Sequence, residues 1–537
     1  MSEAHALSPV SLAVAEASKA LLHQMKPDGH WSAGCRPRLL ESALTLHLLR
    51  GLDNHSAAKA ALSTYCCRSL ESVRLDVTAR RADQSFSAAV AAAALGRPVP
   101  PGDLARLRTL LDADRHTSVP RKQVVLQALL AAVVPGTPGV DTMMLAAVSA
   151  QGGTHQWVGQ ILAALRLERA PSPSSPDLEL LVKTQGADGS WQGHVLATVV
   201  SLLSLSRSGL APDTVDRGVE FLLALLRERG GIPFIRDQDT WVTALGALTL
   251  AEAGVRRHVM EPSARYLRAA QLSDGGRPYA AGVTQSDADD SAVAVTFLAA
   301  HGAPEAAPAV KAGAQYLLNL QNSDGGFPTF VRGAPSDVEI TAKCVRALLA
   351  SPPNDESHRA ARRAWRWLET RQRADGGFAC EWNLSPAFPV MHMVDTACVL
   401  PARTAPNSVQ RVLARCGRYL DATSLPGGGW PLRAEDSQAH PCRPSPGQPA
   451  HTPDSTAEFR HTPAANARRR AGRRARLSEP PALRLRRSHP GTDLPHRRSG
   501  SSNGKGLYPY GYARRRDSHS TDKAAEQAQR KDTRRSG

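Results

Sequence analysis

A short pattern that recurs at a nearly constant interval constrains the fold of this chain more than any other feature. Glutamine followed three residues later by Asp-Gly-Gly starts at Gln271, Gln321 and Gln372, at spacings of 50 and 51 residues, and looser copies start at Gln24 and Gln185. A unit of this length holds two helices of about 15 to 20 residues and their connections. Glycine permits the positive φ of a tight turn, and the glutamine amide can tie down a helix end.

The segments between these turns have the pattern of helices. Across residues 8–425, alanine, leucine and arginine dominate, and apolar residues recur at three- and four-residue spacing, as in the run that starts at Ser42. No sustained alternation with a period of two predicts a strand. We therefore predict an all-α fold. Repeated helix pairs form either an open superhelix or a closed α/α barrel, and periodicity alone does not distinguish them.

Positive charge is concentrated at the C-terminal end. From Ser437 onward there are 22 Lys/Arg against 8 Asp/Glu, which is 14 of the net charge of +17 and leaves +3 on residues 1–436. This stretch is rich in Arg, Pro, His and Ser and has no apolar periodicity, so we expect residues 436–537 to form a disordered basic tail. Because the helical part is nearly neutral, no nucleic-acid partner is expected.

Composition also predicts the compartment. No apolar run reaches the roughly 20 residues that span a bilayer, and the N-terminus lacks the pattern of a secretory signal. The eight cysteines show no CxxC or Cys/His metal spacing. Reduced thiols in a cytoplasmic protein without stable membrane insertion are the expectation. The oligomeric state stays open.

Three carboxylates gather where one helix begins. Asp287, Asp289 and Asp290 lie within four residues, directly before an apolar helical run. One aspartate at this place is explained by helix capping. Three exceed that need, and their mutual repulsion raises the pKa of at least one of them, as in a Brønsted acid. Clustered aspartates also suit Mg²⁺. Capping, acid chemistry and metal binding all remain open at this point.

The repeat and the Asp-x-Asp-Asp cluster together resemble the class II terpene cyclases, over about residues 10–435. That superfamily includes squalene–hopene cyclases and bacterial diterpene cyclases of the copalyl diphosphate synthase type. The resemblance implies that Asp289 protonates a terminal alkene, while Asp287 and Asp290 position and polarise it. It also implies two α/α barrels with a βγ arrangement. The implied limits are 1–22 for the first helix of the DxDD barrel, 23–225 for the γ-type barrel, 226–435 for the β-type barrel, and 436–537 for the tail.

Two features favour the diphosphate branch of that superfamily. Residues 381–386, Glu-Trp-Asn-Leu-Ser-Pro, resemble the W-N-x-S-P-Y-Y stretch of bacterial diterpene cyclases, which makes Trp382 and Asn383 candidate substrate-binding residues. Aromatic residues are only 5% of the chain, few for a cavity that must stabilise successive cations. No DDxxD motif is present, so the diphosphate should be retained. The resemblance thus implies an isomerisation of a linear isoprenoid diphosphate, foremost geranylgeranyl diphosphate, to a bicyclic diphosphate of copalyl type.

Three other functions compete with this one. A squalene–hopene-type triterpene cyclase would share the acid. A non-catalytic α/α-barrel binding protein, inactive because of the unusual C-terminus, would leave the aspartate cluster unexplained. A protein prenyltransferase β-subunit would need a zinc trio of Asp, Cys and His, and no convincing set is present.

The chain departs from the resemblance at both ends. Related diterpene cyclases carry a Glu-Asp pair that holds Mg²⁺ and diphosphate, whereas only Glu41 is available here as a metal ligand, and Arg36 or Arg38 could meet the diphosphate instead. Near the C-terminus, Gly504–Pro509 resembles the family's G-K-D-L-Y-x-P stretch, which makes Lys505 a further candidate substrate residue. The resemblance to the family is lost in the Arg/Pro-rich stretch and resumes at residue 504. This suggests that the codons for residues 437–503 are translated in the wrong reading frame.

Overall fold

The structure is a computed structural model of the whole chain, and its described residues are 9–32, 34–75, 82–113, 120–150, 155–380, 385–401, 406–425 and 429–431. All of them belong to one compact unit, Met1–Glu479. The predicted tail, with the proposed frame error over 437–503, lies outside these residues. None of the helices in the described ranges is long and apolar enough to cross a membrane.

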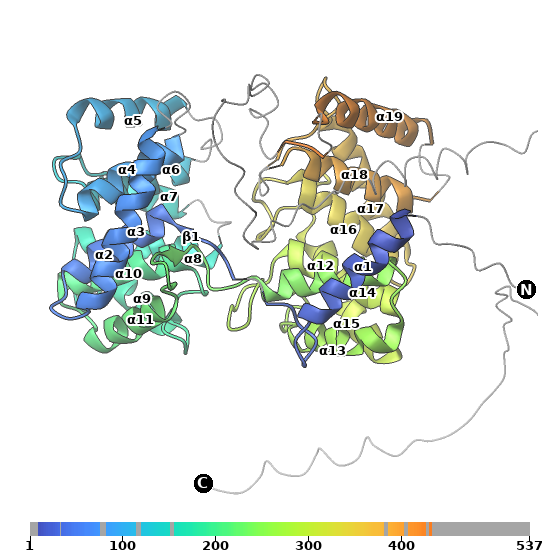
Figure 1. The fold of residues 1–537 in the computed structure, drawn as a ribbon, viewed down its shortest axis with the longest axis horizontal. Coiled ribbons are helices and arrows are strands. Elements are labelled where there is room, and N and C mark those ends of the chain that lie inside the picture. Colours follow the sequence, from blue (N-terminus) through green and yellow to red (C-terminus); the bar gives the residue numbers. More distant parts are fainter. Residues whose placement is uncertain are drawn as a thin grey trace, which may run out of the picture. The chain divides into compact units, whose positions relative to one another are not determined.

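The described chain is helical almost throughout, as predicted (Figure 1). Helix α1 spans Pro9–Gln24. The helices of the N-terminal half are α2 Leu39–Arg50, α3 Ser56–Leu75, α4 Ala82–Ala94, α5 Pro101–Ala113, α6 Pro120–Val133, α7 Thr142–Ala150, α8 Gln156–Arg169, α9 Pro176–Thr184, α10 Val195–Ser208 and α11 Pro212–Ala224. Helices α2, α4, α6, α8 and α10 each contact the next, and α10 returns to α2. This half is therefore a closed ring of helices rather than an open superhelix.

The C-terminal half contains the three full copies of the repeat. Its α-helices are α12 Asp239–Glu252, α13 Glu261–Ala269, α14 Ala288–His301, α15 Ala307–Leu320, α16 Val338–Ala350, α17 Asp355–Thr370, α18 Ala387–Val399 and α19 Pro406–Thr423, and the short 3₁₀ helices are η2 Arg257–Met260 and η3 Pro304–Ala306. Helices α12, α14, α16 and α18 pack against one another in chain order, and α15 and α17 pack outside them. Each half encloses its own apolar core.

Two short strands are an addition to the predicted all-α fold. Strand β1, Pro37–Arg38, pairs antiparallel with β2, Ile232–Pro233, in the register Pro37 to Pro233 and Arg38 to Ile232. Each strand has only two residues, which is too short for a period-two pattern to be visible in the sequence. The domain limits proposed from the sequence stay a prediction.

The glutamine of each repeat ties a turn to the next outer helix. Nε2 of Gln271 donates to the carbonyl oxygen of Gly275 at 2.7 Å and to that of Ala309, in α15, at 2.9 Å. Gln321 makes the same two contacts, with Gly325 at 2.9 Å and Ala360 at 3.0 Å. The amide thereby satisfies carbonyl groups at the turn and in the outer helix, as expected from the sequence.

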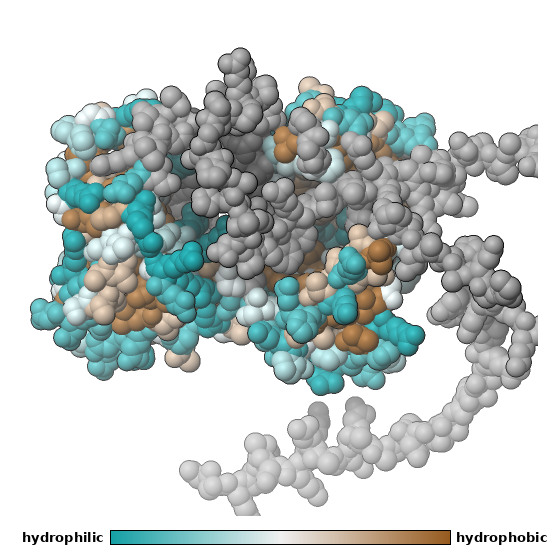
Figure 2. All heavy atoms as spheres, viewed as in Figure 1, coloured by the Kyte–Doolittle hydropathy of each residue, from teal (hydrophilic) through white to brown (hydrophobic). Residues whose placement is uncertain are grey.

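Hydrophobic side chains are gathered in the two cores, and the surface is mixed. On the face shown in Figure 2, hydrophilic residues cover much of the described surface, with hydrophobic residues scattered between them. Scattered apolar residues are normal on a folded protein and indicate no docking surface by themselves.

Candidate active site

The aspartate cluster occupies the start of α14. Asp287 is the N-cap of this helix, with extended backbone angles of φ −128° and ψ 160°, and its Oδ1 accepts the backbone N–H of Asp290 at 2.8 Å. Asp337 caps α16 in the same way, through the N–H of Ile340 at 3.0 Å. Capping therefore accounts for Asp287. It leaves Asp289 and Asp290 without a structural explanation.

Asp287 and Asp290 are almost completely removed from solvent. Their exposed fractions are 2% and 3%, and Oδ2 of Asp287 and Oδ1 of Asp290 have no hydrogen-bond partner in the described chain. Burial, together with the charge of Asp289, raises the pKa of Asp287 to about 7. Burial and the two neighbouring carboxyls raise the pKa of Asp290 well above its ordinary value. This pair can hold a proton at neutral pH.

Asp289 is the most accessible of the three, and it meets a buried lysine. Its side chain is 19% exposed, and its Oδ1 lies 2.8 Å from Nζ of Lys343, whose side chain is 4% exposed. Burial alone would lower the pKa of Lys343, but the carboxylates of Asp289 and Glu339 reverse this, and the net shift is upward. The Lys343 ammonium is therefore charged and forms an ion pair with Asp289.

Sequence reasoning missed Lys343. The feature that could have revealed it is a lysine at the centre of the apolar helix α16, four residues after Glu339. Both side chains are buried. A charged residue on a buried face requires a partner of opposite charge. The sequence did not reveal that this partner lies 54 residues earlier, in the neighbouring helix.

Aromatic rings flank the same ammonium. Nζ of Lys343 lies 5.9 Å from the ring centroid of Trp241, in α12, and 5.8 Å from that of Phe388, in α18. The Phe388 ring also meets the His392 ring edge-on at 4.7 Å. Aromatic faces attract cations, so this part of the barrel suits positive charge beside Asp289.

His392 is a buried imidazole that the sequence analysis did not select. It is 4% exposed, and neither ring nitrogen has a hydrogen-bond partner in the described chain. Burial, followed by the charges of Lys343 and Arg346, lowers its pKa well below the ordinary value. His392 is therefore a neutral base close to the acid cluster.

Glu41 and Arg38, predicted near the diphosphate, lie together at the start of α2. Glu41 is 3% exposed, its Oε2 has no hydrogen-bond partner within the described residues, and burial raises its pKa. Nε of Arg38 lies 3.7 Å from that oxygen, and the Arg38 side chain is 54% exposed. Glu41 is thus not a surface residue. In the described chain no three His, Cys, Asp or Glu side chains form a metal-binding group.

A cluster of rings adjoins Arg38. Its guanidinium carbon lies 5.4 Å from the Phe234 ring centroid. His194 stacks on Trp157 at 4.2 Å, and burial, then the charge of Arg38, lowers the pKa of His194 to about 3. No sequence motif pointed to these rings, since they come from separate elements. The predicted residues Trp382, Asn383 and Lys505 lie outside the described residues.

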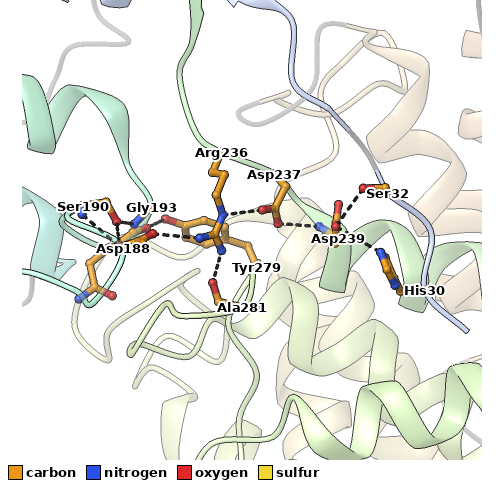
Figure 3. A network of polar contacts seen from close by, with 11 residues as sticks. His30, Ser32, Asp188, Ser190, Gly193, Arg236, Asp237, Asp239, Tyr279 and Ala281 are labelled. Atoms are coloured by element: carbon orange, nitrogen blue, oxygen red, sulfur yellow. Dashed lines mark hydrogen bonds and ion pairs between the residues drawn. The ribbon is translucent and has the colours of Figure 1, made fainter. Parts of the chain in front are cut away.

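Polar contacts connect the two helical halves (Figure 3). Arg236, in the segment before α12, donates to Oδ2 of Asp188 at 2.9 Å, to Oδ2 of Asp237 at 2.8 Å and to the carbonyl oxygen of Ala281. The Tyr279 hydroxyl donates to the carbonyl oxygen of Gln192. The loop that leads to the aspartate cluster is therefore anchored to the N-terminal half.

Known proteins resemble this chain in sequence. Residues 278–430 match the squalene-hopene cyclase C-terminal domain family. A drimenyl diphosphate synthase of Streptantibioticus cattleyicolor is 31% identical over 429 residues, which are 76% of this chain and 77% of that protein. This chain belongs to the class II terpene cyclases.

Other class II cyclases support the same assignment. The drimenyl diphosphate synthase of Streptomyces showdoensis is 29% identical over 425 residues, which cover 75% of this cyclase and 76% of that protein. The structure of ent-copalyl diphosphate synthase from Streptomyces platensis has a TM-score of 0.53 at 19% identity, and the match covers 89% of this cyclase and 94% of that chain. At this identity the structural likeness shows the fold alone.

Proposed function

We propose that this cyclase protonates an alkene of a linear isoprenoid diphosphate and converts it to a bicyclic diphosphate isomer. The observation that carries the proposal is the start of α14, where two enclosed carboxyls of raised pKa adjoin the more accessible Asp289. Asp287 and Asp290 store the proton, and Asp289 delivers it because its side chain is the one that a substrate can touch. This assigns Asp289 the role of catalytic acid.

The atoms balance as an isomerisation. The alkene π electrons take the proton from Asp289, the resulting cation is attacked by the next alkene, and the second ring closes in the same way. A C–H proton next to the final cation then leaves to a base, so that one proton enters and one departs. The diphosphate stays attached throughout. Trp241 and Phe388 support the proposal, because their rings lie where positive charge is already held beside Asp289.

For the diphosphate, we propose Glu41 and Arg38. The buried Oε2 of Glu41, which has no hydrogen-bond partner in the described chain and only a long contact to Arg38, fits Mg²⁺, which needs one or two protein carboxylates when water and phosphate oxygens complete its shell. Mg²⁺ would neutralise diphosphate charge. The partly exposed Arg38 guanidinium can donate to phosphate oxygens directly.

Farnesyl diphosphate is the first substrate to test. The sequence motifs favour geranylgeranyl diphosphate, whereas the relatives at 31% and 29% identity are named drimenyl diphosphate synthases, and a drimenyl group has as many carbons as a farnesyl chain. We expect incubation of the full chain with each diphosphate, then dephosphorylation and gas chromatography, to yield a bicyclic alcohol. Unchanged linear alcohols from both substrates would contradict the proposal.

A further inference from the structure

The repeat that begins at Gln271 has a charged residue at a position where the other repeats have an aromatic residue. The residue three positions after the turn aspartate enters the core of the barrel in every copy whose residues are described. It is aromatic in the sibling repeats, at Trp31, Trp191, Phe327 and Phe378. In the repeat that precedes the aspartate cluster it is Arg277, with an exposed fraction of 0%.

The Arg277 side chain takes the place of an indole. Its Nε donates to the carbonyl oxygen of Leu267, ten residues earlier, at 2.7 Å. The indole N–H groups make the same contact in the repeats that have tryptophan. These are Trp31 to Leu21 at 2.8 Å, Trp191 to Leu181 at 3.0 Å and Trp430 to Leu420 at 2.8 Å. An indole therefore satisfies the structural need at this position as well as a guanidinium does.

The backbone of Arg277 joins the turn to the start of α14, whatever its side chain. Its N–H donates to Oγ of Ser291 at 2.7 Å, and its carbonyl oxygen accepts the N–H of Asp287 at 2.9 Å. The backbone of Phe327 makes the equivalent contacts, with Thr341 at 2.9 Å and Asp337 at 2.9 Å. Phenylalanine in the next repeat thus keeps the same backbone geometry without a charge.

The two terminal nitrogens of the Arg277 guanidinium make no contact in the described chain that stabilises the fold. Nη1 and Nη2 have no hydrogen-bond partner within the described chain. Burial lowers the pKa of Arg277 to about 10, with the charge of Asp290 opposing that shift, so the group stays charged at neutral pH. Enclosing an unpaired charge is costly, and an aromatic ring would avoid the cost. What arginine adds is a buried positive charge, on a residue whose backbone contacts Asp287 and Ser291, that acts electrostatically on Asp290.

We propose that Arg277 is a positioning residue of the acid cluster, whose guanidinium stabilises the carboxylates at the start of α14 once Asp289 has given up its proton. The inference rests on the proposed function. When the proton leaves for carbon, the cluster gains a negative charge in surroundings that substrate has emptied of water. A fixed positive charge stabilises that state without reorganisation. Lys343 supplies such a charge in contact with Asp289, and Arg277 supplies a second one that acts on Asp290 through space.

Several other ionisable groups surround the cluster. They come from the loop at 274–279, α15, α16 and α18, and they are Asp274, Tyr279, Tyr316, Asp337, Glu339, Lys343, Cys344 and His392. Burial raises the pKa of the Tyr279 and Tyr316 hydroxyls and of the Cys344 thiol and lowers that of His392, so these four stay neutral. Among the described residues, the positive charges found to act on Asp289 and Asp290 are those of Lys343 and Arg277.

The test replaces Arg277 in the full chain with the residue of its sibling repeats. Arg277→Trp keeps the contact to Leu267 and removes the charge, Arg277→Lys keeps the charge, and Phe327→Trp is a matched control in the neighbouring repeat. For Arg277→Trp we expect kcat to fall roughly 10- to 100-fold with KM little changed. The pH above which activity declines should rise, because losing a nearby cation raises the pKa of the acid. Arg277→Lys should restore the wild-type pH profile, and Phe327→Trp should leave kcat and the profile unchanged.

Two results would overturn the proposal. One is a wild-type kcat in Arg277→Trp. The other is a lower kcat in Arg277→Trp with an unchanged pH profile, together with an equally low kcat in Arg277→Lys. If Arg277→Trp does not fold, Arg277→Phe takes its place, since two sibling repeats accept phenylalanine. Carboxyl ¹³C NMR titration of the aspartates without substrate gives a second readout, in which their apparent pKa values should rise in the variant. If the wild type proves inactive but this rise is seen, the proposed function fails and the electrostatic role of Arg277 stands. Unchanged titration would overturn the inference alone.

Discussion

At the scale of single residues, three adjacent aspartates have three different surroundings. One carboxyl oxygen of Asp287 caps the helix, and Asp290 is buried away from solvent. Asp289 forms an ion pair with Lys343, and part of its side chain is accessible to solvent. Asp287 therefore serves as a helix cap, and in the proposed mechanism the same side chain type serves as proton store and proton donor, according to what lies around it.

Asp289→Asn should abolish cyclisation while leaving the fold intact. The amide is nearly isosteric and can still accept a hydrogen bond from Lys343, but it cannot deliver a proton to carbon. A loss of roughly 10²- to 10⁴-fold in kcat is expected from removal of a general acid. Product formation and circular dichroism of the purified variant check this. Turnover above about a tenth of the wild-type value would show that Asp289 is not the acid.

Asp290→Asn should stabilise the protein at pH 8 and have little effect near pH 4, close to the ordinary pKa of an aspartate. The pKa of Asp290 is raised in the folded state, so the folded protein binds more protons than the unfolded chain between the two pKa values, and stability falls as pH rises through that range. Asparagine does not ionise, so the variant should not lose stability in this way. Each unit of pKa shift corresponds to about 1.4 kcal/mol of unfolding free energy. Urea unfolding at both pH values measures it. Equal stability of variant and wild type at pH 8 would contradict the assigned shift.

At the scale of elements, the turn of each repeat is a close contact between a loop and an outer helix. Gly275 has a φ of +88°, and a Cβ there would lie 2.5 Å from the carbonyl oxygen of Ala312, in α15. Gly333 has a similar φ of +92°, but no atom lies within 4 Å of its Cβ position. Substitutions at these two glycines therefore distinguish the stability lost through a left-handed backbone from the stability lost through a steric clash.

Gly275→Ala should therefore destabilise the barrel far more than Gly333→Ala. Both substitutions place a side chain at positive φ, which costs about 1 to 2 kcal/mol. The first also forces the turn away from α15, and we expect a total loss of more than about 3 kcal/mol. Chemical unfolding of the two variants side by side gives the difference. Equal losses would mean that backbone strain, not helix contact, governs the turn.

Across the whole molecule, the proposed diphosphate site and the proposed acid site lie in different helical halves. Glu41 and Arg38 belong to the N-terminal helical half, and the aspartate cluster belongs to the other. The Arg236 and Tyr279 contacts tie the loops of the two halves together. If both proposals hold, substitutions in one half should weaken diphosphate binding and substitutions in the other should weaken proton transfer.

Chelation of Mg²⁺ should weaken substrate binding more than the chemical step. In the proposed site Mg²⁺ would neutralise diphosphate charge without taking part in breaking a bond, so its removal should raise KM at least tenfold with a smaller change in kcat. Glu41→Gln should have the same effect, and adding Mg²⁺ should not rescue it. Steady-state kinetics over a range of Mg²⁺ concentrations tests both. Kinetics unaffected by exhaustive chelation would point to recognition by arginine alone.

The helical class, the Asp-Gly turns and the position of the aspartate cluster follow from local patterns in the sequence, because each depends on residues close together in the chain. The folded structure was needed to show that each repeat glutamine reaches the next outer helix, that α10 returns to α2, that Lys343 meets Asp289, and that Arg277 occupies the place of an indole. These features depend on which faces of distant helices pack together. Apolar periodicity shows that a face is buried, but it does not show which charge lies opposite.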